Sequence, residues 1–180
     1  MPDPVSELKA RANILHARIR RGDTAAIMRL RALPEFKTGA EAALIAVAPS
    51  IQLRQSLSII AIEFGFSGWQ HATAILAGAD VVDDFGTTLY PRGAGGHLNS
   101  WYREYDEASA RRSESGGFLL AYRRDFFVAE APFVESLGLD PAAAEWERMG
   151  YDWARPRDVG ARTHLYGVLI SLRPRESPAG

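Results

Sequence analysis

Hydrophobic positions in the first 78 residues recur at helical spacing. Leu8, Ala12, Leu15 and Ile19 are four, three and four residues apart, which places them on one face of a helix over residues 5–21. The same period predicts four more short helices before residue 78, separated by residues that end or begin helices. Residues 1–78 are therefore expected to form a helical module.

The sharpest local pattern is the run Phe64-Gly-Phe-Ser-Gly-Trp69, which lies between two apolar helical segments. Gly65 suits the left-handed position that follows a helix C-terminus. Ser67 and Gln70 have the spacing of a capping box, which begins the next helix. The pattern predicts a helix, a glycine turn and a second helix over residues 50–77, with an architectural role.

This segment carries one family resemblance. Arg20-Arg21-Gly22-Asp23, followed later by Ala61-Ile-Glu-Phe-Gly-Phe-Ser-Gly-Trp69, resembles the helical lead-in segment that precedes ankyrin repeats in some bacterial proteins. The resemblance covers residues 10–78 and implies a helical packing or interaction module, with no catalytic residues. No Thr-Pro-Leu-His repeat follows, and the chain shows no period of about 33 residues.

Residues 79–97 change in character and are expected to be a linker or a functional loop. An acidic cluster, Asp80, Asp83 and Asp84, comes first, and the glycine-rich run 93–96 follows Arg92. Glycines that open onto a helix N-terminus favour an anion. A phosphate loop would continue with Gly-Lys-Ser or Gly-Lys-Thr, which is absent here, so a plain linker is the competing interpretation.

Residues 98–174 are expected to form a second, aromatic-rich subdomain packed on the first. A helix is predicted from Leu98, with Trp101, Tyr105, Ala108 and Arg112 on one face. Residues 118–122 are the most strand-like run, and residues 126–128 either pair with it or begin the next helix. The predicted fold class is mainly α, a short-helix bundle with at most a small β-hairpin near 118–130. The alternative is an α+β fold with a larger sheet.

Composition limits the function classes. The chain has no cysteine, which excludes disulfides, thiolate metal sites and a cysteine nucleophile. No secretory signal and no run of membrane-spanning length is visible, so we expect a soluble, cytoplasmic protein without membrane contact. Residues 1–37 hold eight Lys and Arg against four Asp and Glu, whereas residues 80–152 hold seven against fourteen. The two regions form a charge dipole. The chain as a whole lacks the excess of basic residues that is typical of a nucleic-acid binder.

Aromatic residues are concentrated in the second half, where fourteen of the eighteen follow residue 84. Aromatic walls with a few polar groups are typical of a small-molecule pocket, although the same residues also build ordinary cores. The sequence predicts a ligand-binding set in this region, with the core interpretation left open. Its members are Arg92, His97, Trp101, Tyr105, Tyr122 and Arg123.

Motifs for catalysis are weak. The four histidines include no pair three or four residues apart, so no helical metal site and no cofactor are expected. No Gly-x-Ser-x-Gly elbow is present. The preferred hypothesis is a non-catalytic binding or protein-interaction module of unknown ligand. The alternative is a small enzyme acting on an anionic or aromatic metabolite, with His97 as base and Arg92 or Arg123 as anion clamp.

Overall fold

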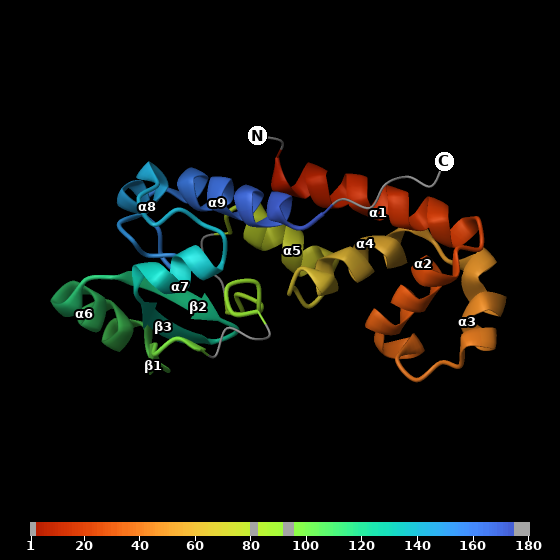
Figure 1. Cartoon of the computed structure of the whole chain (residues 1–180), viewed down its shortest axis with the longest axis horizontal. Coiled ribbons are helices and arrows are strands. Elements are labelled where there is room, and N and C mark those ends of the chain that lie inside the picture. The colour runs from red at the N-terminus through yellow and green to blue at the C-terminus, as the bar shows by residue number, and fades with distance from the viewer. Residues whose placement is uncertain (1–2, 80–82, 92–95, 175–180) are drawn as a thin grey trace.

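The computed structural model describes residues 3–79, 83–91 and 96–174. In these residues the chain forms nine α-helices, three short 3-10 helices and one three-stranded antiparallel sheet (Figure 1). The predicted fold class is confirmed: the protein is mainly α, with a small β element.

The two halves of the chain differ in their secondary structure. The first half contains α1 (Pro4–Arg20), α2 (Thr24–Met28), η1 (Arg29–Ala32), η2 (Pro34–Phe36), α3 (Glu41–Val47), η3 (Ala48–Ser50), α4 (Leu53–Glu63) and α5 (Trp69–Leu76). The second half contains β1 (Ser100–Tyr102), α6 (Tyr105–Ser115), β2 (Phe118–Tyr122), β3 (Asp125–Ala129), α7 (Ala131–Ser136), α8 (Ala144–Met149) and α9 (Val159–Leu172).

The molecule is elongated, with the helical first half at one end and the sheet at the other (Figure 1). Helices α2 and α3 lie at the end remote from the sheet, and α4 and α5 lead back towards it. Helix α9 follows α1 along one long side and contacts it, so the last helix of the chain packs against the first. The described core therefore includes elements from both ends of the sequence.

The predicted helix–turn–helix is present as α4 and α5. Gly65 has a φ of +94° and occupies the expected left-handed position after α4. The Ser67–Gln70 capping box is wrong, because Gly68 is the N-cap residue and no side chain caps α5. His71 takes the equivalent role, since its Nδ1 accepts a hydrogen bond of 2.9 Å from the Ser67 backbone N–H.

The helix predicted from Leu98 is wrong over its first turns. Residues 100–102 form strand β1, and the helix begins only at Tyr105. The four-residue spacing of Trp101 and Tyr105 had suggested one helical face. Pairing of Trp101 with Phe127 on the neighbouring strand determines the local conformation instead.

The hairpin predicted near 118–130 is confirmed as β2 and β3, and β1 adds a third strand in the order β1-β3-β2. Because side chains alternate along a strand, the sheet has two distinct faces. Trp101, Phe127 and Leu120 are paired in register and share one face, and Tyr102, Phe126 and Ala121 share the other. The second face packs against α6.

Residues 83–91 of the expected linker are held between the helices and the hairpin. The backbone of Phe85 donates to the Arg123 carbonyl at 2.8 Å, and Arg123 donates to the Gly86 carbonyl at 2.7 Å. On the opposite side, the Thr87 backbone N–H donates to the Gly65 carbonyl at 2.8 Å. The segment thereby joins the α4–α5 turn to the hairpin turn.

Two glycines make this close approach possible. Gly86 has a φ of +70°, and a Cβ there would lie 2.4 Å from the Gly65 carbonyl oxygen. A Cβ at Gly65 would lie 2.7 Å from the Thr87 hydroxyl. Both contacts are too short for a real Cβ, so each glycine is required by sterics as well as by its dihedral angle.

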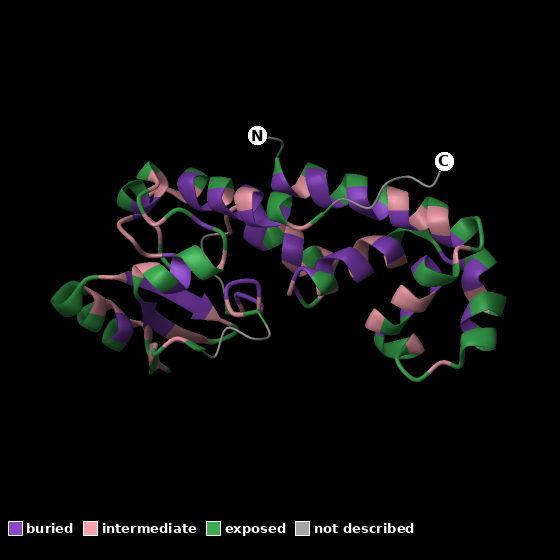
Figure 2. Cartoon of the chain, viewed as in Figure 1, coloured by how far each residue is buried: buried purple, intermediate pink, exposed green. Residues whose placement is uncertain are grey.

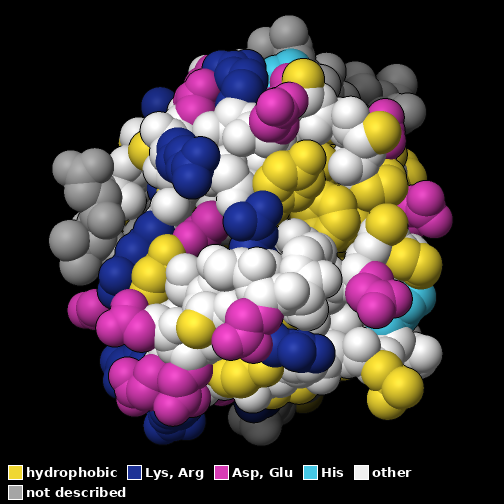
Figure 3. Space-filling model, turned by 90° about the vertical axis from the view of Figure 1, so that its left-hand side faces the viewer, with side chains coloured by type: hydrophobic (Ala, Val, Ile, Leu, Met, Phe, Trp, Pro, Cys, Tyr) yellow, Lys and Arg dark blue, Asp and Glu magenta, His cyan; other side chains and the backbone are white. Residues whose placement is uncertain are grey.

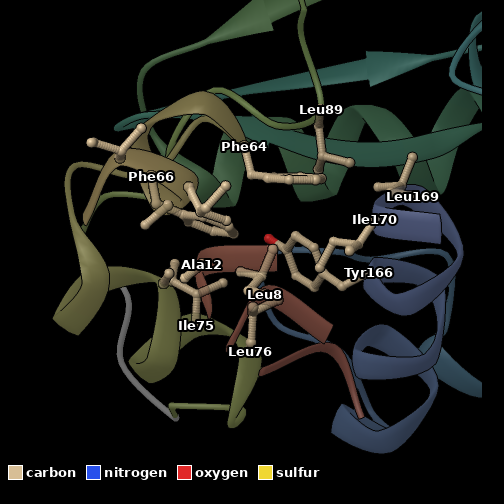
Figure 4. Packing of buried hydrophobic residues seen from close by; sticks show 14 of the residues in the cluster. Leu8, Ala12, Phe64, Phe66, Ile75, Leu76, Leu89, Tyr166, Leu169 and Ile170 are labelled. Carbon is tan, nitrogen blue, oxygen red and sulfur yellow. The ribbon is translucent and has the colours of Figure 1, made fainter. Parts of the chain in front are cut away.

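The buried core is continuous through the centre of the molecule. Buried residues line the facing sides of α1, α4, α5 and α9, whereas α2 and α3 expose much of their surface (Figure 2). Figure 4 shows Phe64 and Phe66 from the α4–α5 turn packed beside Leu89 and Tyr166. The Phe66 and Tyr166 ring centroids are 6.3 Å apart. Rings contributed by the turn therefore connect the helical half to α9.

An arginine side chain fixes the C-terminal end of α9. Arg11 on α1 is 8% exposed, and its guanidinium donates to the carbonyls of Ile170, Arg173 and Pro174 at 2.8–3.0 Å. Its Nε donates to the Glu7 carboxylate at 2.9 Å. The last carbonyls of a helix lack intrahelical partners, so a buried cation is stabilising there.

We expect Gly86→Ala to lower the free energy of unfolding more than Gly22→Ala. Both residues have a positive φ, which costs a residue with a Cβ about 1–2 kcal/mol. Nothing lies within 4 Å of a Cβ at Gly22, whereas the Gly86 Cβ meets the Gly65 carbonyl. The clash adds about 1–3 kcal/mol, measurable by urea denaturation. Equal losses in the two variants would contradict the close approach.

We expect Arg11→Met to destabilise the fold by about 3–5 kcal/mol, because it breaks the buried ion pair between the Arg11 guanidinium and the Glu7 carboxylate. The double variant Glu7→Gln/Arg11→Met removes both charges and is expected to recover part of that loss. The exposed Lys9 on the same helix provides the control, since Lys9→Met is expected to stay within about 0.5 kcal/mol of the parent. Chemical denaturation of the four proteins measures these differences. A double variant as unstable as Arg11→Met would refute the argument.

Candidate functional site

Four of the predicted ligand-binding residues lie around one cluster of rings. Trp101 stacks on Phe127 with centroids 4.6 Å apart and meets Tyr122 edge to face at 6.0 Å. The Arg123 guanidinium lies 5.6 Å from the Tyr122 ring centroid. The His97 ring meets Phe133 edge to face at 5.5 Å. His97, Trp101, Tyr122 and Arg123 are therefore neighbours of a common aromatic group.

The other two predicted residues are not part of this group in the structure. Tyr105 packs with Phe126 on the opposite face of the sheet, so it does not share a site with Trp101. Arg92 lies outside the described residues. Trp101 and Tyr105, which were predicted to share one helical face, thus lie on opposite faces of the sheet. The reason is that a strand replaces the first turns of the predicted helix.

The aromatic group is closely packed around Tyr90. The Tyr90 ring contacts Trp101, Tyr122, Phe127 and Phe133, with centroid distances of 5.0–5.7 Å. Edge-to-face and stacked pairs at these distances are favourable packing contacts. Phe127 and Phe133 belong to the buried core, Tyr90 and Tyr122 are partly buried against it, and Trp101 keeps 43% of its surface exposed. The rings therefore fill the space between them, and the group is exposed to solvent at Trp101.

A different group of residues lines a polar cleft beside α6. The cleft has a volume of about 200 Å³ and lies between α6 and the segment that follows α8. Its lining combines three arginines, hydroxyl groups and a single carboxylate. The lining residues are Tyr105, Ser109, Arg112, Ser113, Leu119, Met149, Gly150, Asp152, Arg155 and Arg157.

One wall of the cleft is a polar face of α6. Tyr105, Ser109, Arg112 and Ser113 follow each other at intervals of four, three and one residues, which places them on the same side of a helix. The Arg112 guanidinium lies 5.0 Å from the Tyr151 ring centroid. Its Nε is buried and has no hydrogen-bond partner among the described residues.

The opposite wall is a left-handed turn that ends α8. Gly150 and Tyr151 have φ values of +71° and +57°, so the chain reverses direction over two residues. It then meets the outer edge of β2, where Leu119 donates to the Tyr151 carbonyl and accepts from the Trp153 backbone N–H, each at 2.9 Å. This short parallel bridge to β2 fixes Asp152 at the cleft.

Asp152 already has partners within the protein. One carboxylate oxygen accepts the Tyr105 hydroxyl hydrogen bond at 2.5 Å, and the other accepts the Arg155 backbone N–H at 2.8 Å. Burial, followed by this hydrogen bond and the Asp152 charge, raises the pKa of Tyr105 to about 12. The Arg155 guanidinium lies 3.7 Å from the Tyr105 ring centroid and opposes the shift. Tyr105 is therefore protonated at neutral pH.

The three guanidiniums of the cleft form no ion pair with the described residues. None of Arg112, Arg155 and Arg157 lies within salt-bridge distance of a carboxylate in the described parts of the chain. The Arg157 side chain crosses Gly150 so closely that a Cβ there would lie 3.0 Å from its Nε. Three positive groups and one carboxylate leave the cleft lining with a net positive charge. The space is thus suited to an anion.

A fourth arginine is buried behind the cleft. Arg162 on α9 is 2% exposed, and it donates to the Trp153 carbonyl at 3.2 Å while its Nε has no partner among the described residues. Burial lowers the pKa of the Arg162 guanidinium, and the electrostatic interactions with Tyr166 and Asp152 act in the opposite direction. An arginine nevertheless stays protonated, so Arg162 adds positive potential next to Asp152.

Figure 3 views the molecule from the end where α6 and α8 lie. Arginine and lysine side chains, drawn dark blue, are distributed over the left half and the centre of this face, with carboxylates between them. Hydrophobic side chains gather towards its right-hand side. Basic side chains therefore share this end of the molecule with an apolar area.

Another hollow, of about 150 Å³, lies near the C-terminal end of α9. Its arginines already have protein partners, because Arg11 binds the end of α9 and Arg29 forms an ion pair with Glu63. Arg173 donates to the Glu63 carbonyl and covers the Phe64 ring. The hollow is part of the packing between α1, α4 and α9, and the cleft beside α6 remains the stronger candidate.

Metal binding and membrane insertion find no support in the described residues. No group of three or more His, Asp or Glu side chains there is arranged to hold a metal ion. Of the acidic cluster, Asp80 lies outside the described residues, and Asp84 accepts the Gly86 backbone N–H at 2.7 Å. None of the described helices combines the length and apolar character needed to cross a membrane.

Sequence reasoning missed the cleft because its two walls are far apart in the chain. The spacing of Tyr105, Ser109 and Arg112 was a usable signal, since it marks a polar helical face with a tyrosine at one end. Arg155 and Arg157 follow the turn at Gly150 and are two residues apart. Nothing in the sequence showed that β2 would bring this turn to α6.

We expect Asp152→Asn to lower the pKa of Tyr105 from about 12 towards 10, because the carboxylate charge disappears. Burial is the larger cause of the shift, so the pKa stays above 10. The folded state holds the Tyr105 proton more tightly than the unfolded chain does. The contribution of Tyr105 to the free energy of unfolding is therefore fully present below pH 10, and it is lost as the pH rises through 12. NMR titration of ring-labelled tyrosine, with Tyr105→Phe for assignment, measures the shift. An unchanged pKa would rule out the Asp152 contribution.

Comparisons with known proteins leave the function to be argued from this geometry. No family model, no curated protein and no solved structure matches the chain. The resemblance of residues 10–78 to the lead-in of ankyrin-repeat proteins therefore stays a prediction. The arginine-lined cleft between α6 and the turn after α8 is the feature from which a function is inferred.

Proposed function

We propose that the protein is a non-catalytic binding module that holds a small anionic ligand in the cleft beside α6. The observation that carries the proposal is the set of Arg112, Arg155 and Arg157, which line one concave space without carboxylate partners among the described residues. Arginine guanidiniums recognise carboxylate and phosphate groups by charge-assisted hydrogen bonds. A ligand anion would supply the missing acceptors.

Several features favour binding over catalysis at this place. The cleft lining contains no histidine, and its single carboxylate, Asp152, already accepts hydrogen bonds from Tyr105 and the Arg155 backbone. A general acid or base works best when its pKa lies near the working pH, whereas Tyr105 has a pKa of about 12. The lining thus offers fixed positive charge and hydroxyl groups, which are binding functions.

A small ligand suits the cleft better than a protein partner. A concave space with few convergent polar groups is the usual form of a small-molecule site. Protein interfaces bury about 800 Å² on each partner and depend on aromatic residues in an apolar centre. The exposed aromatic Trp101 lies on the other face of the sheet from Tyr105, so the cleft does not include it.

The test is a thermal-shift screen with phosphate, sulfate, citrate and acetate at constant ionic strength, against sodium chloride as the reference. An anion at about 100 times its Kd stabilises by about 2.7 kcal/mol, equivalent to a rise in Tm of about 5–10 °C for a chain of this size. We expect at least one of these anions to raise Tm in this way. No rise with any of the four would refute the proposal.

Matched variants locate the effect. Arg112→Gln is expected to lower the affinity at least tenfold, because it removes a guanidinium that lines the cleft. Arg111→Gln, the neighbouring and exposed position on α6, removes the same charge outside the lining and is expected to change affinity less than twofold. Titration calorimetry of both variants gives the comparison. An equal loss in the two would indicate unspecific charge attraction and contradict a site in the cleft.

A further inference from the structure

We infer that the group bound in the cleft is the dianionic phosphate of a small hydrophilic phosphomonoester, rather than a carboxylate. The inference rests on the proposed anion-binding function and goes beyond it by naming the chemical class of the ligand. It is carried by three observations: the charge of the lining, the separation of its arginines on two walls, and the polarity and size of the space.

The charge of the lining matches a dianion. Arg112, Arg155 and Arg157 contribute three positive charges, and Asp152 contributes one negative charge. A carboxylate monoanion would leave this part of the protein positively charged, with the buried Arg162 behind it. A phosphomonoester carries a charge of about −1.5 to −2 at pH 7, which balances the lining. Charge balance in a partly enclosed space is favourable because solvent screening is reduced there.

The arginines approach from two walls. Arg112 projects from α6, whereas Arg155 and Arg157 follow the left-handed turn on the other side of the cleft. A carboxylate is planar and is satisfied by the paired donors of one guanidinium. A phosphate monoester has three peripheral oxygens pointing in different directions and accepts from donors on both walls at once. The arrangement therefore favours the tetrahedral group.

The remaining lining indicates that the rest of the ligand is short and polar. The volume of about 200 Å³ corresponds to about six or seven water molecules, which accommodates a phosphate and a chain of a few atoms. Leu119 and Met149 are the aliphatic members of the lining, and both are buried. The Tyr105 ring is covered by the Arg155 guanidinium. An apolar or aromatic tail has little surface on which to lie here.

Calorimetry with two probes of similar size tests the class of ligand. Glycerol 3-phosphate and glycerate both carry a short hydroxylated chain, and they differ in the anionic group. At pH 7.5 and fixed ionic strength we expect glycerol 3-phosphate to bind at least tenfold more tightly. The Arg112→Gln variant is expected to lose most of this preference, and Arg111→Gln to keep it. Equal or tighter binding of glycerate would overturn the inference.

The dependence of binding on pH gives an independent readout. The second pKa of a phosphomonoester is about 6, so at pH 5 about one tenth of the ligand is dianionic and affinity should fall about tenfold. Sulfate remains dianionic at both pH values and controls for titration of the protein. The charged and titratable groups facing the ligand are Tyr105, Asp152 and the three arginines, with Arg162 behind them. If the ratio of the affinities for glycerol 3-phosphate and sulfate were the same at pH 5 and pH 7.5, binding of the dianion would be contradicted.

The outcomes separate the two proposals. If none of phosphate, sulfate, citrate and acetate binds, the proposed function fails and the inference fails with it. If anions bind but glycerate competes equally with glycerol 3-phosphate, the binding function stands and the phosphate inference alone is wrong. A phosphoserine peptide is the third probe, because it presents the same group on a macromolecule. Tighter binding of the peptide than of glycerol 3-phosphate would overturn the assignment to a small ligand.

Discussion

The position of the sheet depends on the contact between two backbone turns. Gly86 approaches the Gly65 carbonyl so closely that neither position admits a side chain. The same segment forms two backbone hydrogen bonds with Arg123 at the hairpin turn, at 2.8 and 2.7 Å. The helical first half therefore determines where the hairpin lies, and the edge strand β2 of the hairpin then determines where the segment around Asp152 lies.

The cleft is a consequence of this placement. The outer edge of β2 pairs with the segment around Asp152, and the inner edge pairs with β3. Helix α6 precedes β2 in the chain and packs on the sheet face that carries Ala121 and Phe126. Its polar side consequently faces the turn that β2 holds at its edge. The three arginines of the cleft lie close together because β2 positions both α6 and the turn after α8. The free energy of folding offsets the repulsion between their charges.

The sequence was informative where a local rule decides the structure. Helical periodicity located α1 and α4. It was misleading at Trp101, where strand pairing with Phe127 overrides a helical spacing. For the site, the residues of one α6 face could have been grouped from sequence, whereas the partnership with Arg155 and Arg157 depends on long-range pairing that no local pattern encodes. Tyr105 was selected for its supposed neighbour Trp101, and its actual partner is Asp152.

The hydrogen bonds between Arg11 and the end of α9 make the first helix dependent on a distant part of the chain. Arg11 enters the nascent chain early, but its carbonyl partners at residues 170–174 are synthesised 159–163 residues later. Until then Glu7 and Arg11 have no enclosed environment, and the apolar face of α1 lacks α9 as a cover. Enclosure of the α1 side chains is thereby coupled to the synthesis of α9. A ribosome stalled before residue 165 would present an open core to chaperones and proteases.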